Sequence, residues 1–196
     1  MYNSYVIVLL GLSGVGKSHF VNIISQNSCN NIHRLIAVTT RPKRINEVEG
    51  VDKFFLSKDQ FLSDRKTGAY LFDNIVYGEY YAYLKSDFCS QNTYICELYW
   101  RTYLNFKKIL GKNCISIYIK PLNASMLETA IIKRDPDKEI AQFRIRDNNN
   151  DVKELLELEN QGLFDYSFTN DYTKEADEKF QLLIDSILKR LGREVT

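Results

Sequence analysis

The sequence predicts an α/β fold in three layers, with a central parallel sheet covered by helices on both faces. Apolar strand-like runs alternate with helical stretches, and this order favours parallel strands joined by right-handed crossovers. The first apolar run, residues 6–10, leads directly into the glycine-rich stretch GLSGVGKS and then into a helical pattern. With 196 residues, the chain is long enough for one domain with a core and a small inserted lobe.

The remaining strands are expected at short runs rich in β-branched and aromatic residues. A second strand is expected at residues 35–38, a third at 93–98 (TYICEL), a fourth at 114–119 (CISIYI) and a last short one at 164–169. Such runs are typical of strands buried on both faces, so they are assigned to the central sheet.

Helical periodicity predicts which faces of the helices are buried. The predicted inward-facing residues are Phe20, Val21, Ile23 and Ile24 after the glycine loop, Leu104, Ile109 and Leu110 in WRTYLNFKKIL, and Leu155, Leu156 and Leu158 in a helix over 151–161. Gly111 is expected to end the second of these helices. Further helices are predicted at 123–133 and from residue 173 onward.

Residues 39–90 interrupt the strand and helix alternation. They contain short aromatic runs and one helix start, where Ser57 and Gln60 have the spacing of a capping box. We interpret this interval as an inserted β-rich lobe and the polar segment 134–146 as a short lid. The core is then formed by residues 1–38, 91–133 and 147–196.

The composition is that of a globular protein without a strong global field. Hydrophobic residues make up 44% and charged residues 26%, and the formal net charge is +1. This balance argues against binding to nucleic acid or an anionic membrane. No apolar run approaches the roughly 20 residues that span a bilayer, and no secretion signal is recognisable. The four cysteines, Cys29, Cys89, Cys96 and Cys114, lack metal-ligand spacing, so we expect reduced thiols in a cytoplasmic protein, with Cys96 and Cys114 in the core.

The stretch GLSGVGKS matches G-x-x-x-x-G-K-[ST] in full, between a predicted strand and a predicted helix. Its glycines let backbone N–H groups surround a phosphate chain at the positive end of the helix. Lys17 would reach the β- and γ-phosphates of a nucleoside triphosphate, and the Ser18 hydroxyl would coordinate Mg²⁺. The alternative is a plain glycine turn. The candidate triphosphate-binding residues are Gly11, Ser13, Gly14, Val15, Gly16, Lys17, Ser18 and His19.

Residues 38–61, VTTRPKRINEVEGVDKFFLSKDQF, resemble the acceptor-binding segment of guanylate kinases. That family's pattern reads roughly S-x-T-T-R-x-P-R-x-G-E-x-x-G-x-D-Y-x-F-x-S-x-x-x-F. The resemblance continues at Tyr80-Tyr81 and at FDYSFTND, residues 164–171, and so covers nearly the whole chain. The matching residues are Thr39, Thr40, Arg41, Pro42, Arg44, Glu47, Gly50, Asp52, Phe55, Ser57 and Phe61.

The resemblance implies transfer of the γ-phosphate of ATP to GMP or a related monophosphate. Besides the glycine loop, which is one phosphate-binding site or cradle, such a reaction needs a second cradle of fixed cations for the acceptor phosphate. Two arginines suit this role better than lysines because their guanidinium groups are planar. Arg41 and Arg44 are the candidates, with Glu47 and Tyr81 as further acceptor-site residues; a solvated pair of loop charges is the alternative reading.

The resemblance also implies a lid and a donor-base site. Arg134 and Arg144 stand where guanylate kinases have arginines that neutralise the transferring phosphoryl group. Arg146 is an alternative, as is a surface role for any of the three. Asn170 and Asp171 stand where the family contacts adenine, although exposed turn residues would also explain them. Glu97 is expected near Mg²⁺.

The positions that read guanine depart from the family pattern. The serine becomes Ala37, a tyrosine becomes Lys53, and the guanine-gripping glutamate falls on Phe72 beside Asp73. The small pair after the tyrosines becomes Ala82-Tyr83, and the second acid of the family's D-x-D, which starts here at Glu97 in the strand expected at 93–98, becomes Tyr99. Guanine should therefore be discriminated poorly.

Three readings of these departures stay open. A nearby acid, Asp73 or Glu79, reads guanine instead; the acceptor is another nucleotide or a phosphorylated metabolite; or the domain is a non-catalytic module that binds phosphopeptides. The retained Lys17 and Ser18 argue against the last. The expected partners are small-molecule nucleotides, and the chain is expected to be a monomer or a homodimer.

Overall fold

The structure, a computed structural model, describes residues 4–27, 31–45, 47–88, 92–135 and 137–193. Its central sheet has five strands in the order β2-β7-β1-β8-β9, and every pairing in it is parallel. The predicted parallel sheet is thus confirmed. The strands are β1 (Tyr5–Leu10), β2 (Ile32–Arg34), β7 (Thr93–Glu97), β8 (Cys114–Pro121) and β9 (Tyr166–Asn170).

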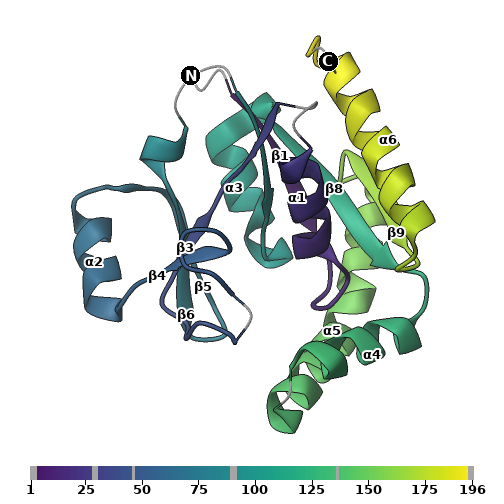
Figure 1. The fold of residues 1–196 in the computed structure, drawn as a ribbon, viewed down its shortest axis with the longest axis horizontal. Helices are drawn as coiled ribbons and strands as arrows, with labels where there is room; N and C mark the ends of the chain where they lie inside the picture. Colours follow the sequence, from purple (N-terminus) through teal and green to yellow (C-terminus); the bar gives the residue numbers. More distant parts are fainter. Residues whose placement is uncertain (1–3, 28–30, 46, 89–91, 136, 194–196) are drawn as a thin grey trace.

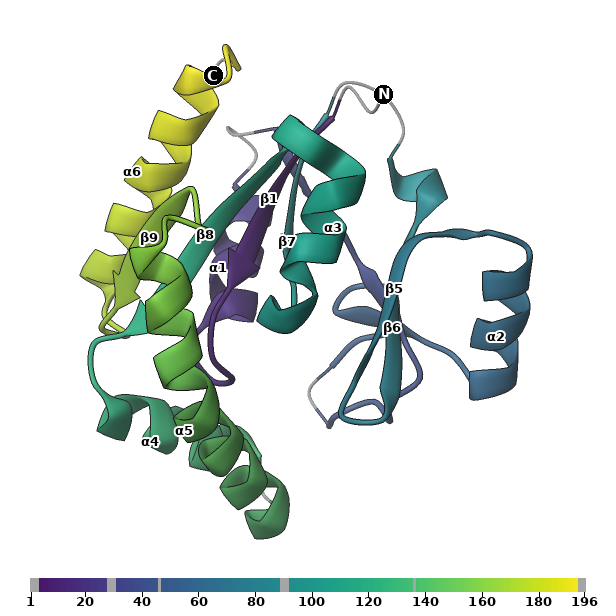
Figure 2. The ribbon, with the colours of Figure 1, turned by 180° about the vertical axis from the view of Figure 1, so that it is seen from behind.

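Helices cover both faces of this sheet. Helices α1 (Lys17–Gln26) and α6 (Lys174–Arg190) lie on one face, and α3 (Tyr103–Leu110) lies on the other (Figures 1 and 2). Residues 6–10 of β1 have no exposed surface, because they are enclosed from both sides. None of the helices in the described ranges combines the length and apolarity that crossing a membrane requires.

A second sheet of four strands, in the order β4-β3-β6-β5, stands apart from the core in Figure 1. Helix α2 (Lys58–Lys66) covers it, and Phe61 of this helix is fully buried against Val38, Tyr70 and Ala82. The Ser57 hydroxyl caps α2 by accepting from the Gln60 amide at 3.2 Å. The strands are β3 (Ala37–Thr39), β4 (Lys53–Phe55), β5 (Tyr70–Val76) and β6 (Glu79–Leu84).

The single strand predicted at 35–38 is wrong, because this stretch connects the two sheets. β2 ends at Arg34 and pairs with β7 in the core, whereas β3 begins at Ala37 and pairs with β4 and β6 in the second sheet. Between them, the Leu35 amide still donates to Ile95 in the core at 3.0 Å. A continuous apolar run therefore serves two sheets, which periodicity does not distinguish.

The predicted division between a polar segment and a helix that starts at residue 151 is also wrong. Helix α5 runs without a break from Lys138 to Asn160, after α4 (Ala124–Arg134). The Asp137 carboxylate caps its start by accepting from the amides of Glu139 and Ile140. The predicted lid boundary at residue 146 therefore falls inside a helix. Helices α4 and α5 reach past one end of the sheet, on the side of the second sheet (Figure 1).

Two predicted helix faces need correction. In α3 the buried residues are Tyr103, Phe106 and Leu110, whereas Leu104 and Ile109 are exposed, because the large aromatic rings pack against the sheet instead. In α5, Leu155 is buried as expected but Leu156 is exposed. Gly111 ends α3, and Cys96 and Cys114 are buried free thiols, as predicted; Cys29 and Cys89 lie outside the described residues. Short 3₁₀ turns are Lys85–Asp87, Trp100–Thr102 and Gly111–Asn113.

Candidate active site

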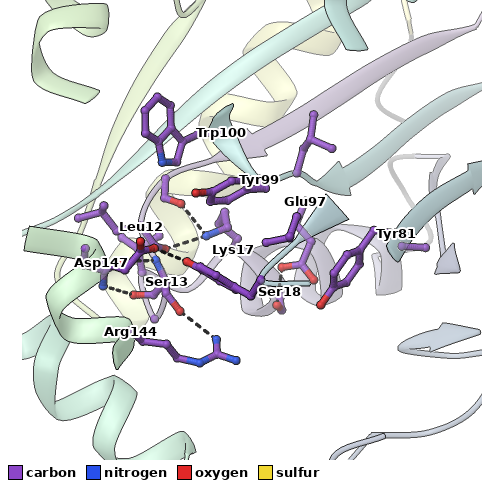
Figure 3. A pocket seen from close by; sticks show the side chains of 18 of the residues that line it. Leu12, Ser13, Lys17, Ser18, Tyr81, Glu97, Tyr99, Trp100, Arg144 and Asp147 are labelled. Atoms are coloured by element: carbon purple, nitrogen blue, oxygen red, sulfur yellow. Dashed lines mark hydrogen bonds between the residues drawn. The ribbon is translucent and has the colours of Figure 1, made fainter. Parts of the chain in front are cut away.

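A cavity of about 370 Å³ opens between the two sheets and the paired helices α4 and α5. The glycine loop after β1 forms its floor, strands of the second sheet form one wall, and α4 and α5 form another. Figure 3 shows side chains from all three regions pointing into it. The cavity is strongly cationic, since its lining includes six lysine or arginine side chains, namely Lys17, Arg41, Arg44, Lys53, Arg134 and Arg144, and three carboxylates, namely Glu97, Asp147 and Asp151.

The glycine loop has a backbone that only glycine satisfies at its two ends. Gly11 has φ +138°, and a Cβ there would lie 2.4 Å from the Ile119 carbonyl oxygen. Gly16 has φ +95° and directly precedes α1; a Cβ there would lie 2.6 Å from Nδ2 of Asn170. These conformations turn the loop around the start of α1, where unpaired amides and the helix dipole favour an anion.

Lys17 is folded back onto its own loop. Its Nζ donates to the carbonyl oxygens of Gly11 at 2.8 Å and Leu12 at 2.7 Å (Figure 3). Burial in the loop lowers the pKa of Lys17 to about 8, and the nearby Glu97 carboxylate opposes this only in part. A phosphate chain in the loop would restore a full anionic partner to this ammonium.

Ser13 joins the loop to α4 and α5. Its hydroxyl accepts from Arg134 at 3.1 Å and from Arg144 at 3.2 Å. Both arginines also pair with Asp135, which is 7% exposed. Arg134 and Arg144 therefore lie at the loop beside one another, with their guanidinium groups held by one carboxylate.

Asn148 of α5 is a site residue that sequence reasoning missed. Its Oδ1 accepts from the Ser13 amide and its Nδ2 donates to the Ser13 carbonyl, both at 2.9 Å. The side chain is 3% exposed and lines the cavity. The run Asn148-Asn149-Asn150 was the available signal, because three asparagines are poor helix formers in the middle of a helix.

Ser18, Glu97 and Lys53 form a chain of polar contacts at the centre of the cavity. The Ser18 hydroxyl donates to Oε2 of Glu97 at 2.6 Å, and Nζ of Lys53 lies 3.1 Å from Oε1. Burial alone would raise the pKa of Glu97, but Lys53, the Ser18 hydroxyl and Lys17 hold it well below its usual range. Glu97 is therefore a carboxylate at any physiological pH.

On the opposite wall, Arg41 is fixed by a paired contact with Glu47. Nη1 of Arg41 donates to Oε2 of Glu47 at 2.7 Å, and Nη2 pairs with Oε1. Arg44 lies 3.8 Å from the same carboxylate and is half-exposed to the cavity. The Arg41 pKa is raised because the Glu47 contacts outweigh desolvation. Glu47 itself is absent from the cavity lining, so it orients the arginines from behind.

Aromatic side chains make up much of the remaining wall. Tyr77, Tyr83, Tyr99 and Trp100 line the cavity together with Tyr81, which lies beyond Glu97 in Figure 3. The Tyr83 hydroxyl donates to the Glu97 carbonyl at 2.6 Å, and the Trp100 indole donates to Asp151 at 2.7 Å. Hydrogen bonds thus fix the rings of Tyr83 and Trp100 in the wall.

One face of α5 contacts every other wall of the cavity. Arg144 and Asn148 bind Ser13 of the glycine loop, Asp147 accepts from the Tyr77 hydroxyl at the β5–β6 turn, and Asp151 accepts from Trp100 after β7. The spacing of three, four and seven residues places these side chains on a single helical stripe. This stripe connects the loop to the second sheet.

Like Glu47, the predicted acceptor-site residues Phe72 and Asp73 do not line the cavity. Phe72 is buried in the core with its ring 5.2 Å from that of Phe106, and Asp73 pairs with Arg65 of α2 at 3.0 Å. The pairing of β5 with β6 shifts between Tyr70 and Phe72, so a count along the strand does not predict the facing. Asn74, two residues further on, lines the cavity instead.

The predicted adenine-contacting pair also lies outside the cavity lining. Asn170 is 2% exposed, and its Nδ2 donates to the Val15 carbonyl at 3.0 Å, which supports the glycine loop. Asp171 accepts from the amide and hydroxyl of Thr173 at the start of α6. Glu79 accepts from Thr40 at 2.6 Å, also away from the lining.

His19 lines the edge of the cavity and contacts Asp177 at 2.8 Å. Arg146 is exposed and is absent from the lining, so Arg134 and Arg144 are the arginines that the structure brings to the loop. Of the guanine-reading departures, Ala37, Lys53, Ala82, Tyr83 and Tyr99 all line the cavity.

A parallel sheet with a phosphate-binding loop after its first strand, facing a cationic second lobe, defines a P-loop phosphotransferase. The family model described as guanylate kinase matches residues 3–187. The chain belongs to the guanylate kinase family, whose members are nucleoside monophosphate kinases.

Relatives agree over most of their length. The chain is 31% identical to the guanylate kinase of Mycoplasmopsis pulmonis over 191 residues, which is 91% of this chain and 93% of that protein. It is 30% identical to the guanylate kinase of Mycoplasma mobile over 205 residues, with 100% and 97% covered. The crystal structure of guanylate kinase from Anaplasma phagocytophilum is similar in fold, with a TM-score of 0.69 and 18% identity over 95% of this chain and 87% of that one.

Proposed function

We propose that this protein transfers the γ-phosphoryl group of ATP to a nucleoside monophosphate, with GMP as the acceptor. The observation that carries this proposal is that two groups of anion-binding side chains line one cavity. Lys17 and the loop amides form the donor cradle, and Arg41, Arg44 and Tyr81 form the acceptor cradle. In-line transfer requires two phosphates to be held face to face in this way.

Each cradle has a distinct role in the proposed reaction. The loop amides and Lys17 hold the β- and γ-phosphates, while Arg41 and Arg44 hold the acceptor phosphate in line with them. Arg134 and Arg144, which meet at Ser13, supply positive charge where the phosphoryl oxygens gain negative charge. We propose residues 39–90 as the acceptor lobe and residues 134–146 as the lid that brings these arginines to the loop.

Ser18 and Glu97 fit a magnesium ion. Their oxygens lie 2.6 Å apart, and hard oxygen ligands from one or two side chains, completed by phosphates and water, are what Mg²⁺ prefers. Within the described ranges no group of three or more acidic, histidine or cysteine side chains forms a metal cage, which agrees with this open arrangement. When bound, Mg²⁺ would neutralise charge on the β- and γ-phosphate oxygens.

We propose GMP because it is the acceptor of the guanylate kinase family, although the residues at the base-binding positions of this chain differ from the family pattern. Phe72 is withdrawn into the core, and Tyr83 and Tyr99 replace polar side chains in the wall. Asn74 is among the polar side chains that line the cavity beside these rings. Stacking on the aromatic wall would supply affinity with less base discrimination. A different monophosphate or a phosphorylated metabolite is the second candidate.

A screen of ADP formation from ATP and Mg²⁺ tests the proposal. The acceptors are GMP, dGMP, IMP, AMP, CMP, UMP and phosphorylated sugars, and Lys17→Ala serves as the control for contaminating kinases. The proposal predicts turnover with GMP that disappears in the variant. Turnover with a sugar phosphate alone would overturn the acceptor, and failure to bind ATP at all would favour the interaction-module reading.

A further inference from the structure

We propose that Lys53 is a third cation of the acceptor site, held by Glu97 until Mg²⁺ replaces it. The proposal rests on the phosphoryl-transfer function proposed above and concerns a residue at which the chain departs from its family pattern. It follows from the position of Lys53, from the partner that holds it, and from what binding of the donor nucleotide does to that partner.

Lys53 lies on the second sheet and lines the cavity that both cradles share. It is the first residue of β4 and pairs in register with Ala37 of β3, so both residues face the same side of the second sheet. Both line the cavity, and the Lys53 side chain is only 12% exposed. Its charge is close enough to Lys17 to contribute to lowering the Lys17 pKa, which places it near the donor loop as well.

The partner of Lys53 is shared with the magnesium site. Oε1 of Glu97 lies 3.1 Å from Nζ of Lys53, while Oε2 accepts from Ser18 at 2.6 Å. The Lys53 ammonium is thus a cation bound to the same carboxylate that we assign to Mg²⁺. The other two carboxylates of the lining, Asp147 and Asp151, have partners of their own in Tyr77 and Trp100.

Binding of the metal and the donor nucleotide would weaken the contact between Glu97 and Lys53. With a divalent ion held by Ser18 and Glu97, the carboxylate would be neutralised and Lys53 would lose the contact that holds it. The lysine side chain has four rotatable bonds and carries its charge at the tip, which suits it to move to a new anion. The anion that the opposite wall presents is the acceptor phosphate on Arg41 and Arg44. Donor binding would therefore tighten acceptor binding.

Calorimetry of GMP binding tests this, with and without a non-hydrolysable ATP analogue and Mg²⁺. In the presence of the analogue and Mg²⁺, Lys53→Gln is expected to weaken GMP binding about tenfold or more, and in their absence less than about threefold. Lys53→Arg keeps the charge and is expected to stay within about threefold of the wild type in both conditions. Lys66→Gln, on the exposed face of α2, is the matched control and should change neither value.

A double-variant cycle separates this role from a merely structural ion pair. Glu97→Gln, measured without nucleotide or metal, should tighten GMP binding because Lys53 is no longer held. The gain should vanish in Lys53→Gln/Glu97→Gln. A gain that persists in the double variant would overturn the proposal. Equal GMP affinities for Lys53→Gln and Lys66→Gln in the presence of the analogue and Mg²⁺ would also overturn it. Equal losses in Lys53→Gln and Lys53→Arg would also overturn it, since the charge would then be irrelevant.

Manganese binding gives a readout that is independent of the acceptor. Electron paramagnetic resonance of Mn²⁺ with ADP should show tighter metal binding in Lys53→Gln than in the wild type, because a competing cation has been removed. Unchanged or weaker Mn²⁺ affinity would contradict the exchange. If the wild type phosphorylates no nucleoside monophosphate, the proposed function fails; if it does so and Lys53→Gln binds GMP normally, only the role of Lys53 fails.

Discussion

Replacing Asn148 by alanine removes the clamp between α5 and the glycine loop. Two hydrogen bonds of 2.9 Å to the Ser13 backbone are lost at a position that is 3% exposed. Each buried backbone group left without a partner costs about 1–3 kcal/mol, and because Ser13 is only partly buried we expect a loss of roughly 2–4 kcal/mol in the free energy of unfolding for the two groups together. For a chain of this size, that corresponds to a fall in melting temperature of roughly 5–15 °C.

Urea and thermal unfolding measure the stability change, and amide hydrogen exchange at Ser13 measures the local effect. Quenching of Trp100, the single tryptophan and a cavity residue, gives the affinity for an ATP analogue. That affinity should fall as the loop loosens. Asn150→Ala, two residues along on the exposed side of α5, is the matched control. Equal behaviour of the two variants, including equal Ser13 exchange, would refute the clamp.

Three further outcomes are expected. Burial lowers the Lys17 pKa to about 8, so the ammonium is lost as pH rises above 8 and the affinity for the ATP analogue should fall by up to about tenfold per pH unit there. An affinity that stays constant between pH 7 and 9.5 would contradict this. Lys17→Arg, whose guanidinium stays charged, should show such a constant affinity. Arg41→Ala should raise the KM for the acceptor about 10- to 100-fold while the KM for ATP changes little, because the lost contacts are charge-assisted; equal changes in both constants would remove Arg41 from the acceptor cradle. Tyr77→Phe should raise the acceptor KM about two- to tenfold, since only the hydrogen bond to Asp147 is lost and the ring contact with Phe143 stays; an unchanged KM would mean that this contact does not bring the lobe and α5 together.

The parts of the fold that depend on neighbouring residues could be predicted from the sequence. Gly11–Ser18 encodes its own loop, because Gly11, Gly14 and Gly16 have positive φ angles that other residues rarely adopt and a strand and a helix flank it. Ser57 caps its helix through a residue three positions away. The parallel sheet follows from the alternation of strands and helices, which is also a local property.

What could not be predicted depends on distant partners. Asn148 binds a residue 135 positions away, and no periodicity indicates such a contact. The sequence pattern divides helix α5 into pieces because four polar residues on its inner face, Arg144, Asp147, Asn148 and Asp151, line the cavity and interrupt its amphipathic pattern. Phe72 was assigned to the acceptor pocket by counting along the chain, but the irregular pairing of β5 places its ring in the core.

A single ligand that spans both cradles tests the central claim most directly. Adenosine and guanosine joined by a pentaphosphate should bind with a stoichiometry of one per chain and quench Trp100. Lys17→Ala and Arg41→Ala should each weaken this binding by at least tenfold, whereas Asn150→Ala should not change it. Undiminished binding to Arg41→Ala, or two independent ligands per chain, would contradict a cavity in which the two phosphate sites face each other.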